Sequence, residues 1–280
     1  MSRALWTDRP GPVTRPPAVA GMFYPADPGE LAAWIDGALN RAAAMPVPEG
    51  DDPGRVRALV VPHAGYVYSG HTAARGYDLL RRRDPARRPR RVAVLGPTHR
   101  VGIRGLALPR ADFMATPLGS CPIDPAGLEE LAQVRINAAT HAEEHSIEVQ
   151  VPFIQRILGD LPIVPLAVGQ AEPQEVAEVI ESLVADPQTL IVISSYLSHY
   201  HPHDVARRLD DQTIARVLAG DDSIEPDRAC GCRPLDGLLH AAPGLGWSAH
   251  LLAACTSGDT AGDRSRVVGY ASFALTEEDR

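Results

Sequence analysis

The chain has 280 residues, 45% of them hydrophobic and 22% charged, with a formal net charge of -8 at pH 7. A chain of this size can bury a sufficient core without disulfides or a structural metal, and its acidic balance argues against general nucleic-acid binding. All of its basic residues are arginines, which excludes a lysine Schiff base and a P-loop lysine.

Residues 1–14 contain proline and arginine but lack the apolar stretch of a signal peptide. We expect them to form an extended or poorly ordered arm. No apolar run is long enough to cross a bilayer, and the four cysteines do not have the pattern of a secreted disulfide framework. The sequence therefore predicts a cytoplasmic protein with no membrane partner.

Short runs rich in valine, isoleucine and leucine alternate with longer segments that suit helices. Strands are expected at residues 56–61, 91–95, 162–168, 190–194 and 267–275. Helices are expected at residues 28–44, 70–82, 126–133, 147–158, 173–185, 204–219 and 234–242. The first strands are apolar on both faces, as in sheets covered by helices on both sides. The pattern predicts a single α/β domain over residues 1–280, with a central mostly parallel or mixed sheet.

Residues 81–91, which read RRRDPARRPRR, are the one strongly basic stretch of this acidic chain. Charge runs of this kind are usually solvated. We therefore interpret the stretch as an exposed loop between a helix and a strand.

Three of the expected strands each end in a turn that carries a histidine. The turns place His63, His99 and His199 after the strands at residues 56–61, 91–95 and 190–194. In open α/β sheets, sites form outside the carboxyl ends of the strands. Each histidine alone fits an ordinary hydrogen-bonded turn, but three in equivalent positions favour one shared site.

Converging imidazoles suit a transition metal, since neutral histidine is a good ligand for iron, copper and zinc. Two histidines and a carboxylate form the facial triad of non-heme iron oxygenases. Asp259, in a small polar loop before the last strand, could supply the carboxylate, and Cys255 is a soft ligand or a nucleophile in the same loop. A loop whose aspartates only make turns is the alternative.

Two further groups remain open to interpretation. His145 precedes the helix expected at residues 147–158, where the helix dipole favours its neutral form as a base, a substrate-binding group or a ligand. Equally, Glu144 and Ser146 could simply cap that helix. Cys230 and Cys232 lack a matching second pair, so a zinc site is disfavoured and a buried structural role is expected.

Taken in order, these blocks resemble the Memo family, which includes the B component of AmmeMemoRadiSam systems. The resemblance covers residues 15–275. Its blocks are RPPAVAGMFYP at 15–25, PHAGYVYSG at 62–70, LGPTH at 95–99, EHSIEVQVPF at 144–153, ISSYLSHY at 193–200 and SGDTAGDRSRVVGYA at 257–271. The resemblance implies a fold similar to class III extradiol dioxygenases, which use non-heme Fe(II).

The resemblance also implies a ligand set. It makes His63 and His99 metal ligands, and the position of a C-terminal cysteine ligand in some Memo proteins falls on Asp259 rather than Cys255. A carboxylate there favours Fe(II), with copper and zinc as alternatives. One departure stands out, because Tyr196 replaces the aspartate that the family usually has in a Ser-Asp-x-x-His pattern.

Three functions are consistent with these residues. The first is a metal-dependent, dioxygenase-like oxidoreductase that acts on a small organic substrate, with O2 as a candidate co-substrate. Its expected catalytic residues are His199, His145 and Tyr196, and its expected substrate-binding residues are Tyr24, Tyr66, Arg100 and Cys255. The second is a non-catalytic metal- or peptide-binding protein, and the third is a zinc-dependent hydrolase or lyase. The sequence predicts no oligomeric state.

Overall fold

The computed structural model describes residues 11–46, 52–128 and 130–278. Most of the arm expected at residues 1–14 therefore lies outside the described residues, although Thr14 and Arg15 form the short strand β1. Within the described residues, no helix has both the length and the apolar content needed to span a membrane.

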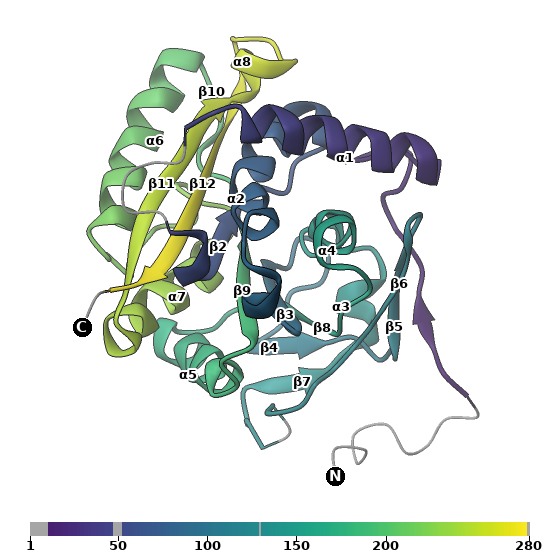
Figure 1. Cartoon of the computed structure of the whole chain (residues 1–280). Coiled ribbons are helices and arrows are strands. Elements are labelled where there is room, and N and C mark those ends of the chain that lie inside the picture. Colours follow the sequence, from purple (N-terminus) through teal and green to yellow (C-terminus); the bar gives the residue numbers. More distant parts are fainter. Residues whose placement is uncertain (1–10, 47–51, 129, 279–280) are drawn as a thin grey trace.

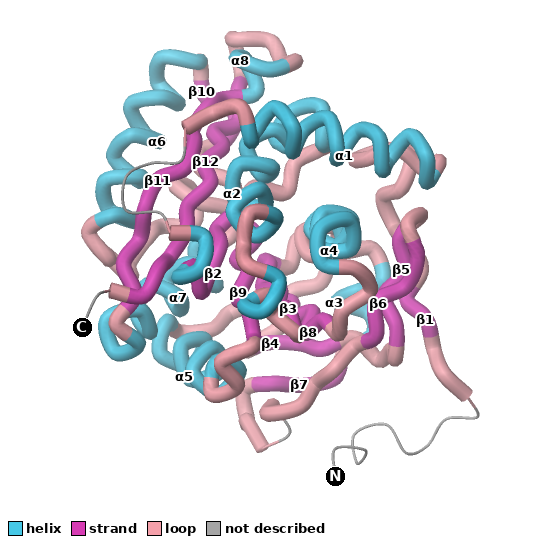
Figure 2. Tube along the Cα trace, viewed as in Figure 1, coloured by secondary structure: helices cyan, strands magenta, loops and turns pink. Residues whose placement is uncertain are grey.

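The elements alternate along most of the chain, as the sequence predicts (Figures 1 and 2). The helices are α1 (Pro28–Ala43), α2 (His71–Arg81), α3 (Ala138–Ala142), α4 (Val151–Leu158), α5 (Pro173–Val184), α6 (His203–Leu218), α7 (Cys232–Leu245) and α8 (Ser257–Thr260). The strands are β1 (Thr14–Arg15), β2 (Val56–Val61), β3 (Arg91–Pro97), β4 (Leu106–Leu108), β5 (Phe113–Thr116), β6 (Gly119–Pro122), β7 (Val134–Ile136), β8 (Ile163–Val168), β9 (Thr189–Ser194), β10 (His199–His201), β11 (Trp247–Thr256) and β12 (Val267–Glu277).

Within the described ranges, the main sheet has nine strands in the order β10-β12-β2-β9-β3-β8-β4-β7, with β11 paired to β12. Strands β2, β9, β3 and β8 run parallel to one another, whereas β12 pairs antiparallel to β2 and β4 antiparallel to β8. A small second sheet has the order β1-β5-β6. The predicted α/β fold with a mixed central sheet is confirmed.

Alternate residues of the parallel strands face two separate hydrophobic cores. On one face, Val60, Leu95 and Ile193 pack with apolar residues of α5, α6 and α7. On the other face, Leu59 and Val94 pack with apolar residues of α1, α2 and α4. Burial on both faces explains why these strands read as continuous apolar runs.

Two expectations for individual elements were wrong. The helix expected at residues 126–133 is a series of turns in the described residues of that segment. The strand β11 was not expected, because its residues are mostly only half-buried and show no clear apolar alternation. It pairs with β12 over nearly its whole length, so tertiary pairing decides its conformation where local sequence does not.

Asp236 on α7 gives the fold a predictable pH dependence. The carboxyl group is 7% exposed, and burial, together with Asp222 nearby, raises its pKa to about 7. The folded state then keeps a proton that the unfolded chain releases near pH 4, so stability should fall as pH rises from about 4 to 7. We expect D236N to reduce this pH-dependent fall in the free energy of unfolding by about 1–2 kcal/mol, after allowance for solvent screening.

The variant keeps the carbonyl oxygen that accepts from the Ile224 amide at 2.9 Å. Urea unfolding of the wild type, D236N and the exposed control D227N at pH 5 and pH 8 measures the effect. An equal pH dependence in all three proteins would contradict the assignment to Asp236.

Candidate functional site

The histidine cleft lies at the carboxyl ends of the parallel strands. Because β2, β3 and β9 run in the same direction, the turns that follow them meet at one edge of the sheet. His63 follows β2, His99 follows β3 and Tyr196 follows β9. The ring of His63 lies 5.2 Å from that of His99 and 4.7 Å from that of Tyr196, centroid to centroid. The sequence predicts that His63, His99 and His199 share one site; the structure brings His63 and His99 together, whereas His199 does not line the cleft.

His63 is fully buried, and its hydrogen bonds fix its tautomer. Ser194 Oγ donates its only proton to the Ser146 carbonyl at 2.6 Å. Towards His63 Nδ1, 3.1 Å away, the same oxygen can therefore only accept. The proton sits on Nδ1, which leaves an unprotonated Nε2. That nitrogen is buried and has no hydrogen-bond partner among the described residues, and burial followed by His99 keeps the His63 pKa well below its usual value.

The carboxylate of Glu144 accepts hydrogen bonds from the ring and the backbone of His99. Its Oε1 accepts from His99 Nδ1 at 2.8 Å, and its Oε2 accepts from the His99 amide at 2.6 Å. The amides of His145 and Ser146 also donate to Oε1, each at 2.9 Å. Burial opposes ionisation, but these donors, His99 foremost, lower the Glu144 pKa to about 2. Glu144 therefore stays a carboxylate that orients the His99 ring, in addition to capping the following turn.

Cys230 is a candidate metal ligand beside His63 and His99 that the sequence did not predict. Its Sγ lies 2.9 Å from His99 Nε2, and its amide donates to the Tyr196 carbonyl at 3.1 Å. Ligand atoms of His63, His99 and Cys230 all lie within 4.8 Å of one another. Cys230 precedes α7 and follows a long irregular segment, so its approach to β3 had no periodic signal in the sequence.

The pKa values of His99 and His145 are shifted in opposite directions. Burial opposes protonation of His99, but hydrogen bonds to Cys230 and Glu144 raise its pKa to about 10. Burial and the neighbouring His99 lower the His145 pKa to about 4. The two rings stack at 4.6 Å. A cation that binds at His99 Nε2 must therefore displace a proton, whereas His145 is already neutral at pH 7.

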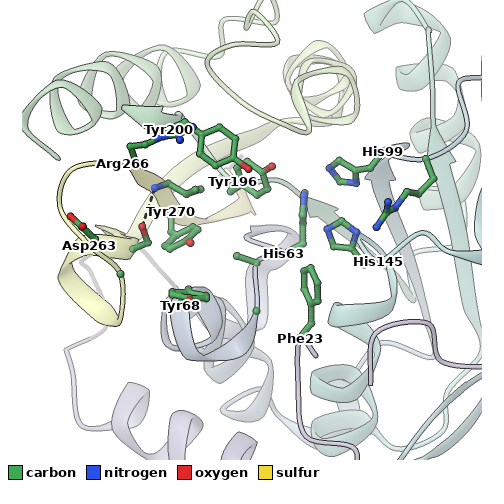
Figure 3. Close-up of a pocket in the computed structure, with 16 residues that line it drawn as sticks. Phe23, His63, Tyr68, His99, His145, Tyr196, Tyr200, Asp263, Arg266 and Tyr270 are labelled. Atoms are coloured by element: carbon green, nitrogen blue, oxygen red, sulfur yellow. Dashed lines mark hydrogen bonds between the residues drawn. The ribbon is translucent and has the colours of Figure 1, made fainter. Parts of the chain in front are cut away.

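The histidine cleft has a volume of about 630 Å³ and is open on one side to solvent. Figure 3 shows His63, His99 and His145 on one side of it, with Tyr200, Tyr270 and Arg266 on the other. Its lining residues are Phe23, His63, Ala64, Gly65, Tyr68, His99, Arg100, His145, Tyr196, Tyr200, Ser257, Gly262, Asp263, Arg266, Val268 and Tyr270.

Tyr200 is held in an uncommon backbone conformation at the mouth of the cleft. Its φ is 64°, in the left-handed region that a tyrosine rarely adopts. The guanidinium of Arg266 lies 5.2 Å from the centre of its ring, a cation–π distance. Such strain clusters at functional sites and persists only where surrounding contacts enforce it.

Several residues predicted for the site lie elsewhere. Asp259 accepts from Thr256 and lies 2.9 Å from His203 Nε2, and it is absent from the ligand groups found among the described residues. Cys255 contacts Thr72 at 3.1 Å. Neither residue is among those that line the cleft.

Two tyrosines and a histidine also lie outside the lining. Tyr24 donates to Glu148 at 2.5 Å and Tyr66 donates to the Val149 carbonyl at 2.8 Å, so both hydroxyls are used inside the protein. His199 lies 6.1 Å from Tyr196, ring to ring, without reaching the lining. Arg100, His145 and Tyr196 do line the cleft, as expected positions for ligand contact.

A mixed sheet with histidines gathered at the carboxyl ends of its parallel strands defines an α/β protein with a candidate metal centre. A family model described as Memo-like protein matches residues 15–274. A MEMO1 family protein of Methanopyrus kandleri is 36% identical over 93% of this chain and 98% of its own. Those of Sulfolobus acidocaldarius and Archaeoglobus fulgidus are 37% and 36% identical over 92% and 93% of the chain, and 98% and 99% of their own. The chain belongs to the Memo family.

Proposed function

We propose that this Memo-family chain is a metal-dependent oxidoreductase whose metal is held by His63, His99 and Cys230. The observation that carries the proposal is the buried, unprotonated Nε2 of His63, which has no partner among the described residues. Leaving such a lone pair unused in a buried position is costly. His99 Nε2 and Cys230 Sγ lie close enough to share one ion with it.

The donor set fits a first-row transition metal. Imidazole binds iron, copper and zinc, and a thiolate adds softness that a carboxylate lacks. With Cys230 in place of Asp259, the argument for iron over copper is weaker than the sequence suggested. The carboxylate behind His99 is the usual partner of a metal-binding histidine, since it fixes the tautomer and raises the basicity of the ligand.

A redox-active metal held there would supply one-electron chemistry and Lewis acidity. The chain's own residues position a small organic substrate beside it. Phe23, Tyr68 and Tyr270 offer ring faces for an aromatic or apolar ligand. Arg100 offers positive charge, and neutral His145 can accept a proton from a substrate hydroxyl at its ring nitrogen.

Elemental analysis of protein purified under anaerobic conditions tests the metal assignment. We expect a stoichiometric transition metal in the wild type and in the surface control H240A. The metal should be lost from H63A and strongly reduced in C230S, because each substitution removes a ligand atom. D259N should keep its metal. If instead C230S kept the metal and D259N lost it, Asp259 rather than Cys230 would be the third ligand.

The identity of the metal then separates the functions. Iron or copper, with oxygen uptake in a screen of phenolic and other small substrates, supports the oxidoreductase. Zinc with the same dependence on His63 would favour hydrolysis or lyase chemistry instead. Absence of metal, with no uptake on reconstitution, would overturn the proposal and favour a binding protein that grips ligands in the aromatic part of the cleft.

A further inference from the structure

The arginine-rich run at residues 81–91 does not form one solvated loop. Arg81 and Arg82 pair with Asp78 at 2.8 and 2.6 Å, and Arg91 is buried, with Asp124 at 3.5 Å. Arg83 is buried too, at 8% exposure. The run therefore contributes to distinct sites, and part of it forms a pocket that the proposed function does not use.

This arginine pocket lies at the amino-terminal ends of β2 and β9, the opposite edge of the sheet from the histidine cleft. Its volume is about 260 Å³, slightly below the usual range for drug-sized ligands. Four arginines line it, Arg57, Arg83, Arg87 and Arg88, and no acidic residue is among its described lining residues.

Two of the four guanidinium groups are anchored. Arg83 donates to the carbonyls of Val56 and Gly54 at 3.0 and 3.2 Å. Arg57 donates to the Pro187 carbonyl at 3.0 Å and lies 3.5 Å from Glu277. These contacts hold the two side chains before any ligand arrives, which lowers the entropy cost of binding.

The other two, Arg87 and Arg88, are exposed, and their guanidinium groups make no hydrogen bond or ion pair within the described residues. Burial lowers the pKa of Arg83, and repulsion from the neighbouring cations Arg57 and Arg87 lowers it further. Glu277 and Asp52 act in the opposite direction, and the pKa of Arg83 remains lowered on balance. An anion in the pocket would relieve the repulsion and pair the free donors.

We propose that the arginine pocket binds a small phosphate-bearing anion, independently of the histidine cleft. Planar guanidinium groups match the geometry of phosphate oxygens and pair with them through two parallel hydrogen bonds. The pocket is small and concave, and the protein as a whole carries a net charge of -8. Both features favour a small ligand over a nucleic-acid backbone, which needs an extended basic surface.

Calorimetric titration with inorganic phosphate and with pyrophosphate at low ionic strength tests the proposal. We expect saturable binding at one site per chain. The double variant R87A/R88A should weaken it by about tenfold or more, since it removes both free donors. R135A, an exposed arginine on β7, is the matched control and should leave binding unchanged. R87K/R88K should recover only part of the binding lost in R87A/R88A, because lysine keeps the charge without the paired donors.

The same titration of H63A distinguishes this pocket from the metal centre. Binding should be equal in H63A and the wild type. Loss of binding in H63A would place the phosphate in the histidine cleft and overturn the proposal. Three other results would also overturn the proposal. They are the absence of saturable binding, an equal loss of phosphate affinity in R135A, and tighter binding of an RNA oligonucleotide than of pyrophosphate through the same arginines.

Discussion

E148Q is expected to lower the free energy of unfolding by about 3–5 kcal/mol. Glu148 is fully buried and pairs with Arg15, which is 6% exposed. Its two oxygens also accept from the amides of Ala18 and Val19 and from the Tyr24 hydroxyl. Glutamine removes the negative charge and leaves the guanidinium of Arg15 buried without its counter-charge, which is the main source of the loss.

Chemical denaturation measures this effect against E143Q, which neutralises an exposed neighbour and should change stability by less than about 0.5 kcal/mol. Adding R15M to E148Q should recover part of the loss, because the unpaired buried charge is then absent. A loss below about 1 kcal/mol in E148Q would show that water reaches Arg15 in the variant.

The role of this pair extends from stability to the cleft. Glu148 fixes residues 15–24 against the turn that begins α4. Phe23 lies in that segment and packs on His145, ring centroids 4.6 Å apart. The pair therefore holds one wall of the cleft in place.

E144Q is expected to weaken metal binding by about 10–100-fold. Both carboxylate oxygens of Glu144 accept from N–H groups, namely the His99 ring, its amide and the amides of residues 145 and 146. A glutamine can present only one acceptor oxygen, so its amide nitrogen must face a donor. The ring of His99 then loses its fixed orientation and part of its basicity.

Competition with a chromophoric chelator measures the affinity, and E143Q again serves as the control. Circular dichroism should show that E144Q remains folded. Unchanged affinity in E144Q would indicate that His99 does not bind the metal through Nε2. Reduced affinity in both variants would indicate a general electrostatic effect instead.

The sequence predicts the central sheet well because parallel strands buried on both faces carry long apolar runs, as in β2, β3 and β9. The same regularity places His63 and His99 at one edge, since turns after parallel strands meet there. Strand β11 has no comparable run of buried residues. Its residues are mostly half-buried, and its strand conformation depends on pairing with β12.

The site was harder to predict wherever irregular backbone delivers the side chain. Cys230 reaches His99 from a segment without strand or helix periodicity, so its residue type suggested only a buried thiol. The polar loop around Asp259 and the family resemblance both predicted a ligand there, yet the capping turn of α8 and His203 engage its carboxylate. Glu144 performs the capping role that its position suggested, and it also orients His99, a role that the sequence did not indicate.

The parallel arrangement of β2, β9 and β3 also has a consequence for folding kinetics. His63 and Ser194 are 131 residues apart in the chain, as are His99 and Cys230. No short segment of the unfolded chain carries all three proposed ligands, so long loops must close before these residues meet. A metal should therefore bind the native state far better than the unfolded chain, raise the melting temperature with its concentration and chiefly slow unfolding rather than speed folding.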